Sequence, residues 1–202
     1  MADIDRDGRN DLALTAGDSA IVLLQDPHPA PPGNFSNPVS YPSGIQSADV
    51  AVSDLNNDSL PDLAVANRGD ISGTVSLLMQ NPLNTGTFQP AVHYDTGINS
   101  TAVAIGNLND DFLPDLVVAN DETGAGSISV LLQNPLAPGI FLDAANYPGL
   151  DGPEDVAIAD VSGDGLADIV VADNTSPPKG PPYYRPQDTD NPGTYIDRVE
   201  IP

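Results

Sequence analysis

Aspartate recurs at alternate positions in four short segments of the sequence, residues 3–11, 54–62, 107–115 and 160–168. In the first segment Asp3, Asp5, Asp7 and Asp11 occupy positions 1, 3, 5 and 9. Calcium takes six to eight oxygen ligands, and alternate side chains of a tight loop can converge on one point. This spacing predicts a calcium-binding loop in each segment.

The candidate ligands are the side chains at positions 1, 3, 5 and 9 and the backbone carbonyl at position 7. They are Asp3, Asp5, Asp7, Arg9 and Asp11; Asp54, Asn56, Asp58, Leu60 and Asp62; Asn107, Asn109, Asp111, Leu113 and Asp115; and Asp160, Ser162, Asp164, Leu166 and Asp168, with Arg9, Leu60, Leu113 and Leu166 contributing their carbonyls. A helix-flanked calcium loop also needs Glu at position 12. Apolar residues stand there, so strands are expected on either side of each loop.

The four loops differ in charge. The first has four carboxylates, the second and fourth have three each, and the third has two because Asn107 and Asn109 replace acids. Phe112 also stands where Gly8 and Gly165 permit a positive φ. We therefore expect up to four Ca²⁺ ions, with the site at 107–115 the weakest or filled by sodium or water. The alternative is that the loops are metal-free Asx turns.

Composition restricts the partners. The chain has 29 acidic and six basic residues, a net charge of -23, and only three of the acids are Glu. Such a charge repels nucleic acid and anionic membranes and attracts cations. The absence of Cys excludes disulfides and thiolate sites, and no apolar run approaches the ~20 residues of a membrane span. We expect an extracellular or cell-surface location, with a leader removed or with this sequence forming part of a longer chain.

The loops belong to a repeat of about 53 residues, since their starts are 51, 53 and 53 residues apart. Each unit reads as a short strand, the acidic loop, a second strand that is apolar on both faces, a third strand ending in Gln, and a fourth running from a Phe to a Tyr. Phe88 and Tyr94 are examples of this last pair, which we expect to pack between repeats. Four short strands per repeat predict an all-β fold of antiparallel β-propeller blades.

The first repeat lacks its first strand, and only two strands of the fourth are recognisable. We therefore predict a repeat domain over residues 1–173 with about three to four blades, incomplete or completed by other strands or chains. Residues 174–202 hold seven prolines, which favours an extended tail or linker.

The loop pattern resembles the FG-GAP / VCBS family, the calcium-loop repeats of integrin α-subunit propellers and of many bacterial surface proteins. The match to D-x-[DN]-x-D-G-x-x-D is specific at 3–11, good at 54–62 and 160–168, and degraded at 107–115. The Phe-Gly and Gly-Ala-Pro signatures of the integrin form are absent, so the bacterial branch is closer. The resemblance implies calcium in the loop between the first two strands of each blade, and a role in adhesion, recognition or scaffolding.

These features favour a structural or interaction module over an enzyme, because His28 and His93 have no repeated catalytic partner. The expected partners are another protein or further copies of the chain, paired through open strand edges at residues 1–3 and after Asp173. The alternative is a carbohydrate-binding, lectin-like propeller or an accessory domain of a polysaccharide-active enzyme. Its aromatic contacts would have to come from Tyr183, Tyr184 and Tyr195, because Trp is absent.

Overall fold

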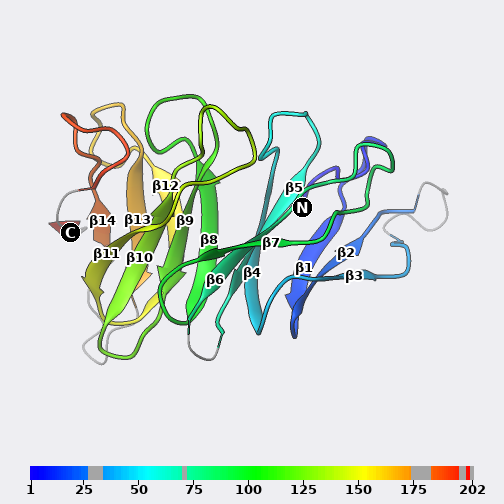
Figure 1. Cartoon of the computed structure of the whole chain (residues 1–202), viewed down its shortest axis with the longest axis horizontal. Helices are drawn as coiled ribbons and strands as arrows, with labels where there is room; N and C mark the ends of the chain where they lie inside the picture. Colours follow the sequence, from blue (N-terminus) through cyan, green and yellow to red (C-terminus); the bar gives the residue numbers. More distant parts are fainter. Residues whose placement is uncertain (27–33, 70–71, 174–182, 196–198, 201–202) are drawn as a thin grey trace.

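The computed structural model describes all residues except 27–33, 70–71, 174–182, 196–198 and 201–202. The described residues form four antiparallel sheets and contain no helix (Figure 1). Among them, therefore, no helix has the length and apolar character needed to cross a membrane. The expected all-β fold with propeller-like blades is confirmed.

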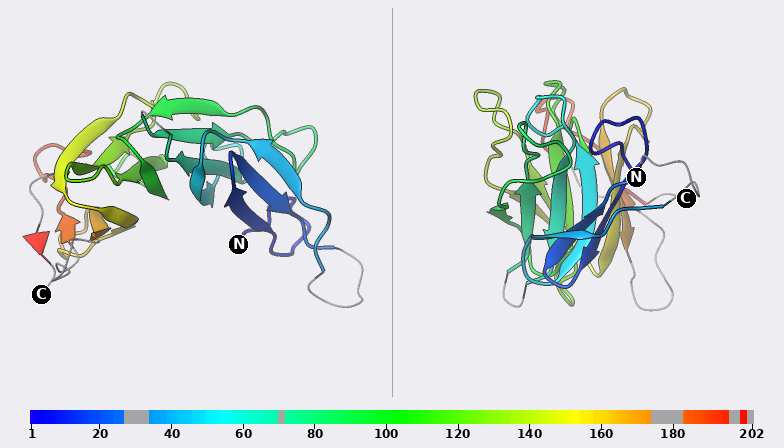
Figure 2. Two further views of the ribbon diagram at one scale, coloured as in Figure 1. Left: turned by 90° about the horizontal axis from the view of Figure 1, so that it is seen from below. Right: turned by 90° about the vertical axis from the view of Figure 1, so that its right-hand side faces the viewer.

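The first sheet has three strands and each of the others has four. They are β1 (Leu12–Ala16), β2 (Ser19–Leu23) and β3 (Val39–Pro42); β4 (Ser47–Ser53), β5 (Asp62–Asn67), β6 (Thr74–Leu78) and β7 (Val92–Asp95); β8 (Ser100–Gly106), β9 (Asp115–Asn120), β10 (Gly126–Leu131) and β11 (Ala145–Leu150); and β12 (Pro153–Ala159), β13 (Asp168–Asp173), β14 (Tyr183–Arg185) and β15 (Val199–Glu200). Within each sheet the strands pair in chain order. Each sheet is thus one up-and-down blade, and the blades follow one another along an open arc with both chain ends on the same side (Figure 2).

The apolar cores lie between neighbouring blades. Every residue of β5 and of β9 is buried, because these strands are covered on both faces. Side chains of a strand alternate between its faces. Leu63 and Val65 accordingly pack with Ile4 of the first blade, whereas Ala64 and Ala66 belong to the cluster shared with the third blade.

Aromatic pairs join consecutive blades at the positions predicted for packing. Tyr41 of the first blade meets Phe88 of the second edge to face, with ring centroids 5.2 Å apart. Tyr94 and Phe141 repeat the contact at 5.9 Å, as do Tyr147 and Tyr195. Such pairs contribute about 0.5–1.5 kcal/mol beyond area burial, so the recurring aromatics stabilise the stacking of blades.

The fourth blade is more complete than expected. Residues 174–202 were interpreted as a tail, yet β14 pairs with β13 and β15 pairs with β14. Gln187 and Tyr195 form the same bridge that Gln133 and Phe141 form in the third blade. The Pro-rich stretch and the replacement of Phe by Tyr hid this repeat. The strand edge predicted to be open after Asp173 is therefore occupied.

The described residues of the first blade include no first strand, as predicted. Its sheet begins at β1, and the chain before it makes only an isolated bridge between Ala2 and Asp11. Among the described residues β1 is therefore an edge strand, close to where an open edge was expected.

Candidate metal centre

The acidic loops join the first strand of a blade to the second. Residues 54–61 connect β4 to β5, and the loops at 107–114 and 160–167 connect β8 to β9 and β12 to β13. The first loop leads into β1. Because every blade runs in the same order, the four loops lie at the same end of the blades.

All four loops share one backbone shape. Positions 4 and 6 have positive φ in each: Arg6 (65°) and Gly8 (89°), Asn57 (61°) and Ser59 (69°), Asp110 (62°) and Phe112 (67°), and Gly163 (81°) and Gly165 (88°). Glycine adopts this region freely, whereas a residue with a Cβ is destabilised there by about 1–2 kcal/mol. The strained Phe112, which is 89% exposed, shows that the surrounding blade imposes the turn even on the least acidic loop.

The position-9 aspartate is the anchor of each loop. Asp62 is fully buried, and its two carboxylate oxygens accept hydrogen bonds from Leu55 N at 2.9 Å and Gln80 N at 2.7 Å. Asp115 makes the same pair of contacts with Leu108 N and Gln133 N, both at 2.8 Å. The carboxylate thus connects the loop to the end of the third strand and is held in one orientation.

The position-1 and position-5 side chains close the turn. Asp54 Oδ2 accepts from Ser59 N at 2.7 Å, and Asp58 Oδ1 accepts from Leu60 N at 2.8 Å. In the third loop Asn107 Oδ1 instead accepts from the amides of Asn109 and Asp111, at 3.4 and 3.2 Å. The backbone amide of each position-7 residue is therefore tied to the position-5 side chain, as Leu113 N to Asp111 Oδ1 also shows.

The fourth loop has the same framework as the second. Asp168 is fully buried and accepts from Val161 N at 2.9 Å and from Gln187 N at 3.3 Å. Asp160 accepts from Gly163 N and Gly165 N, and Asp164 accepts from Leu166 N. Ser162, the predicted position-3 ligand, donates its backbone amide to Asp168 at 2.8 Å.

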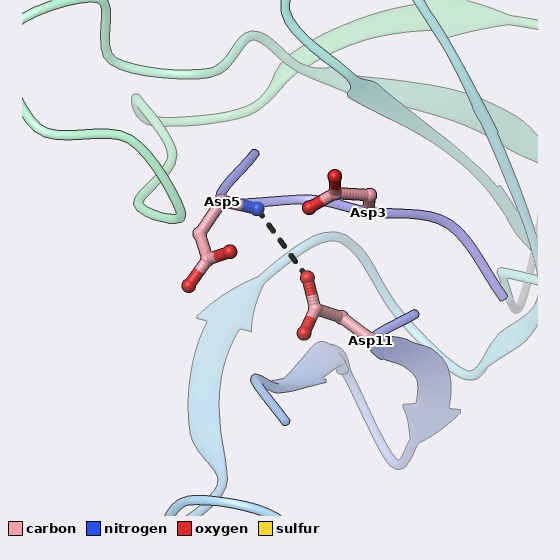
Figure 3. A group of neighbouring side chains, drawn as sticks. All are labelled: Asp3, Asp5 and Asp11. Atoms are coloured by element: carbon pink, nitrogen blue, oxygen red, sulfur yellow. Dashed lines mark hydrogen bonds between the residues drawn. The ribbon is translucent and has the colours of Figure 1, made fainter. Parts of the chain in front are cut away.

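The first loop gathers three carboxylates at one place. One oxygen each of Asp3, Asp5 and Asp11 lies within 4.8 Å of the others. Figure 3 shows these three side chains. Asp3 Oδ1 is buried and has no hydrogen-bond partner among the described residues. Asp7, the fourth predicted ligand, instead forms an ion pair with Arg9 at 2.7 Å. Three of the four predicted acids thus converge at one place.

Burial and nearby charges raise the pKa of three loop aspartates. Burial, together with the charges of Asp11, Asp7 and Asp3, raises the pKa of Asp5. Burial likewise raises the pKa of Asp62 to about 6 and that of Asp115 to about 6, against the lowering effect of their backbone hydrogen bonds. A bound cation would favour the charged carboxylates and oppose these shifts.

Sequence comparison places the repeat in a family. The profile of the FG-GAP-like repeat matches residues 3–65, 54–118 and 107–171. The chain belongs to the FG-GAP-like repeat family. Each match starts at position 1 of one acidic loop and ends three residues beyond position 9 of the next. FG-GAP-like repeats are typically structural or interaction modules. No curated protein matches the chain.

A glutamine that sequence reasoning missed links each of the first three FG-GAP-like loops to the next blade. Gln80 Nε2 donates to Ile4 O at 3.0 Å, and Gln133 Nε2 donates to Leu55 O at 2.9 Å. Gln187 Nε2 makes the same contact with Leu108 O. In each case the acceptor is the position-2 carbonyl of the preceding loop. The recurring Gln at the end of the third strand was visible, but only the stacked FG-GAP-like blades reveal its partner.

The Ser76–His93 contact is structural. Ser76 Oγ lies 2.6 Å from His93 Nδ1, so this histidine has a partner that sequence reasoning did not identify. Ser76 is fully buried, and at the equivalent positions of the next FG-GAP-like blade Ser129 Oγ donates to Asn146 Oδ1 at 2.5 Å. Because the side-chain amide of Asn146 takes the place of His93 in the next blade, the contact does not require a basic side chain. His28 lies outside the described residues.

The raised pKa values predict an unusual pH dependence for the calcium-free protein. Asp62 and Asp115 bind protons more tightly when folded than when unfolded, between about pH 4 and 6. With EDTA, the free energy of unfolding should therefore rise as pH falls from about 7.5 to about 5. If the loops bind calcium, the order should reverse in its presence, because a cation binds the deprotonated carboxylates. Urea unfolding at both pH values, with EDTA or calcium, measures this.

An Asp62→Asn, Asp115→Asn double variant is the control for these two groups. In EDTA it should lose much of the pH dependence while keeping the remaining contribution of overall charge repulsion. A chelated parent protein that is more stable at the higher pH would contradict the assignment.

Proposed function

We propose that the chain is a calcium-binding, extracellular or cell-surface propeller module that acts as a structural scaffold or protein-interaction domain rather than as an enzyme. The observation that carries the proposal is the first loop. Asp3, Asp5 and Asp11 hold carboxylate oxygens within 4.8 Å of one another, and a buried oxygen of Asp3 has no donor among the described residues. At an effective dielectric of 20, each such pair of charges repels by on the order of 3 kcal/mol.

A divalent cation is the ligand that best offsets this repulsion. The oxygen-only donor set suits a hard cation such as Ca²⁺. The hydrogen bonds of the position-9 carboxylate orient it before the ion arrives, as second-shell contacts do in metal sites. The ion would then join three parts of a loop that the blade already holds in place, which links ion binding to folding.

The four loops should differ in affinity because they share a backbone but not a charge. Asp3, Asp5 and Asp11 make the first site the strongest. Asp54, Asp58 and Asp62 supply the second, assisted by Asn56. The third has neutral Asn107 and Asn109, and its strained Phe112 adds no ligand. We expect this third site to be the weakest.

The proposed scaffold role rests on shape and charge. The blades form an arc (Figure 2) whose surface carries a net charge of -23. Ser76 is fully buried, and its contact with His93 is replaced in the next blade by a contact between Ser129 and Asn146, which supplies no base. Tyr195, considered for sugar stacking, is 6% exposed and packs on Tyr147. These features support a protein partner over catalysis, and they remove one aromatic from the carbohydrate alternative.

Calorimetric titration of the chelated protein with calcium tests the proposal. We expect about four binding events with the weakest at least tenfold below the others, since affinity follows ligand charge. Asp5→Asn should weaken one event by at least about tenfold. Asp143→Asn removes the same charge from an exposed position outside the loops and should leave all events in place. The absence of binding heat at millimolar calcium would overturn the proposal.

A further inference from the structure

Each internal blade has two faces of different character. The face toward the preceding blade, the leading face, consists in the second blade of Leu63, Val65, Leu78 and Phe88, packed against the first blade. The face toward the following blade, the trailing face, consists of Leu55, Ala64, Ala66 and Leu77, packed against the third blade. All these side chains are at most 9% exposed. A blade contact therefore always joins a leading face to a trailing face.

The first blade has a leading face with no described blade against it. The register of β1 with β2 places Leu12 opposite Leu23, as Leu63 lies opposite Leu78 in the second blade. The face corresponding to that of the second blade is thus Leu12, Leu14, Leu23 and Phe35. Leu14 is 38% exposed and Phe35 is 36% exposed, whereas Val65, the counterpart of Leu14, is fully buried.

The fourth blade has the complementary surface. The register of β13 with β14 places Val170 opposite Tyr184, as Ala64 lies opposite Leu77. The trailing face of this blade is Val161, Val170, Ala172 and Tyr184. Val161 is 42% exposed, although Leu55 and Leu108 at the same loop position are fully buried. This face retains its apolar character without a described blade to cover it.

We infer that the trailing face of the fourth blade docks on the leading face of the first blade of a second copy, repeating the internal blade contact between molecules. The two faces are of opposite kinds, so the contact is head-to-tail rather than two-fold symmetric. Continuity with three internal interfaces built from the same positions identifies the occupant as another blade of this repeat. The inference goes beyond the proposed calcium role and does not depend on it.

One polar contact defines the register of this docking. In each internal contact a glutamine at the end of the third strand donates to the position-2 carbonyl of the preceding loop. Gln25 occupies that position in the first blade, where the described residues include no preceding loop. Val161 supplies the corresponding carbonyl in the fourth. Gln25 of one copy would therefore donate to Val161 O of the next.

The net charge of -23 opposes this association. Copies repel one another at low ionic strength, and salt screens the repulsion because the Debye length falls from about 30 Å at 0.01 M to about 8 Å at 0.15 M. Apolar burial does not weaken with salt in this way. Self-association should therefore be favoured by salt, the opposite of an interface held by ion pairs.

Light scattering and sedimentation velocity of the full chain, in calcium and about 0.3 M salt, provide the test. The mean mass should rise from that of a monomer near about 5 µM to that of a dimer or more near about 500 µM. Leu14→Asp spoils the leading face and Ala172→Asp spoils the trailing face. Each variant alone should associate at least about tenfold more weakly.

Mixing the two variants is the decisive measurement. The intact trailing face of the Leu14→Asp protein can meet the intact leading face of the Ala172→Asp protein, so a 1:1 heterodimer should form and nothing larger. Leu136→Asp, at a side chain 92% exposed outside both faces, introduces the same charge and should associate like the parent. Thermal unfolding checks that each variant is folded. If Leu14→Asp does not fold, Gln25→Ala is the milder substitution that tests the leading face.

Three results would overturn the inference: a parent protein that stays monomeric throughout, variants that associate as strongly as the parent, or a mixture that yields no heterodimer. Repeating the parent measurement in EDTA distinguishes this inference from the calcium proposal. A protein that binds no calcium but still associates head to tail would overturn only the calcium proposal.

Discussion

Chelation of the purified protein with excess EDTA is expected to lower its midpoint of thermal unfolding by about 20 °C. A ligand present at 100 times its dissociation constant stabilises the folded state by about 2.7 kcal/mol per site, and a domain of this size shifts by about 2–4 °C per kcal/mol. If three loops hold calcium as proposed, its removal costs about 8 kcal/mol of stability. Differential scanning calorimetry with and without the chelator measures the shift.

Restoring calcium in excess over the chelator should return the original midpoint, whereas magnesium should not. Mg²⁺ demands near-octahedral geometry and releases its water reluctantly, so it suits a flexible multi-carboxylate loop poorly. An unfolding midpoint that is the same with and without EDTA would show that the loops fold as metal-free turns. The hydrogen bonds within 54–62 would then be their only support.

Replacement of Asp62 by Ala is expected to destabilise the protein by about 4 kcal/mol in the absence of calcium, and by more in its presence. The carboxylate is buried and accepts from Leu55 N and Gln80 N. Its removal leaves two buried backbone donors without partners, at about 1–3 kcal/mol each, and a cavity in addition. Urea unfolding in EDTA isolates this structural contribution, because no ion is then bound in either protein.

Asp58→Asn in the same loop is the matched control. Asp58 lies at an exposed position, and the amide oxygen of Asn can still accept from Leu60 N. This variant should unfold like the parent in EDTA and should be less stable only in calcium, because it has lost a charged ligand. If Asp62→Ala were also neutral in EDTA, the anchoring role assigned to the position-9 carboxylate would be wrong.

The local sequence pattern was sufficient to predict much of the fold. The repeat spacing, the paired apolar strands such as 62–67 and 115–120, and the loops between first and second strands all follow from residues close together in the chain. Backbone conformation at position 6 was also accessible, since Gly8 and Gly165 mark a positive φ, whereas the positive φ of Arg6, Asn57 and Asp110 at position 4 was not predicted. These features depend on period and on steric preference, which short segments encode.

The second half of the fourth blade could not be read in this way. Gln187 and Tyr195 follow Gln133 and Phe141 at the repeat distance, but the Pro-rich stretch before them has the composition of a linker. Their place in a blade depends on contacts with the third blade, where Gln187 bonds to Leu108 O and Tyr195 packs on Tyr147. Tertiary packing outweighed local composition there.

The candidate metal sites were likewise predictable in part from sequence and in part only from the three-dimensional structure. Residue types and spacing determined which oxygens could surround an ion, and with what charge. Only the three-dimensional structure showed that the position-9 carboxylates are buried anchors, that Asp7 pairs with Arg9, and that Asp3, Asp5 and Asp11 converge. The reason is physical: composition sets the charge of a loop, but the burial and direction of the position-9 carboxylates depend on amides at the end of the third strand of the blade, such as Gln80 N and Gln133 N.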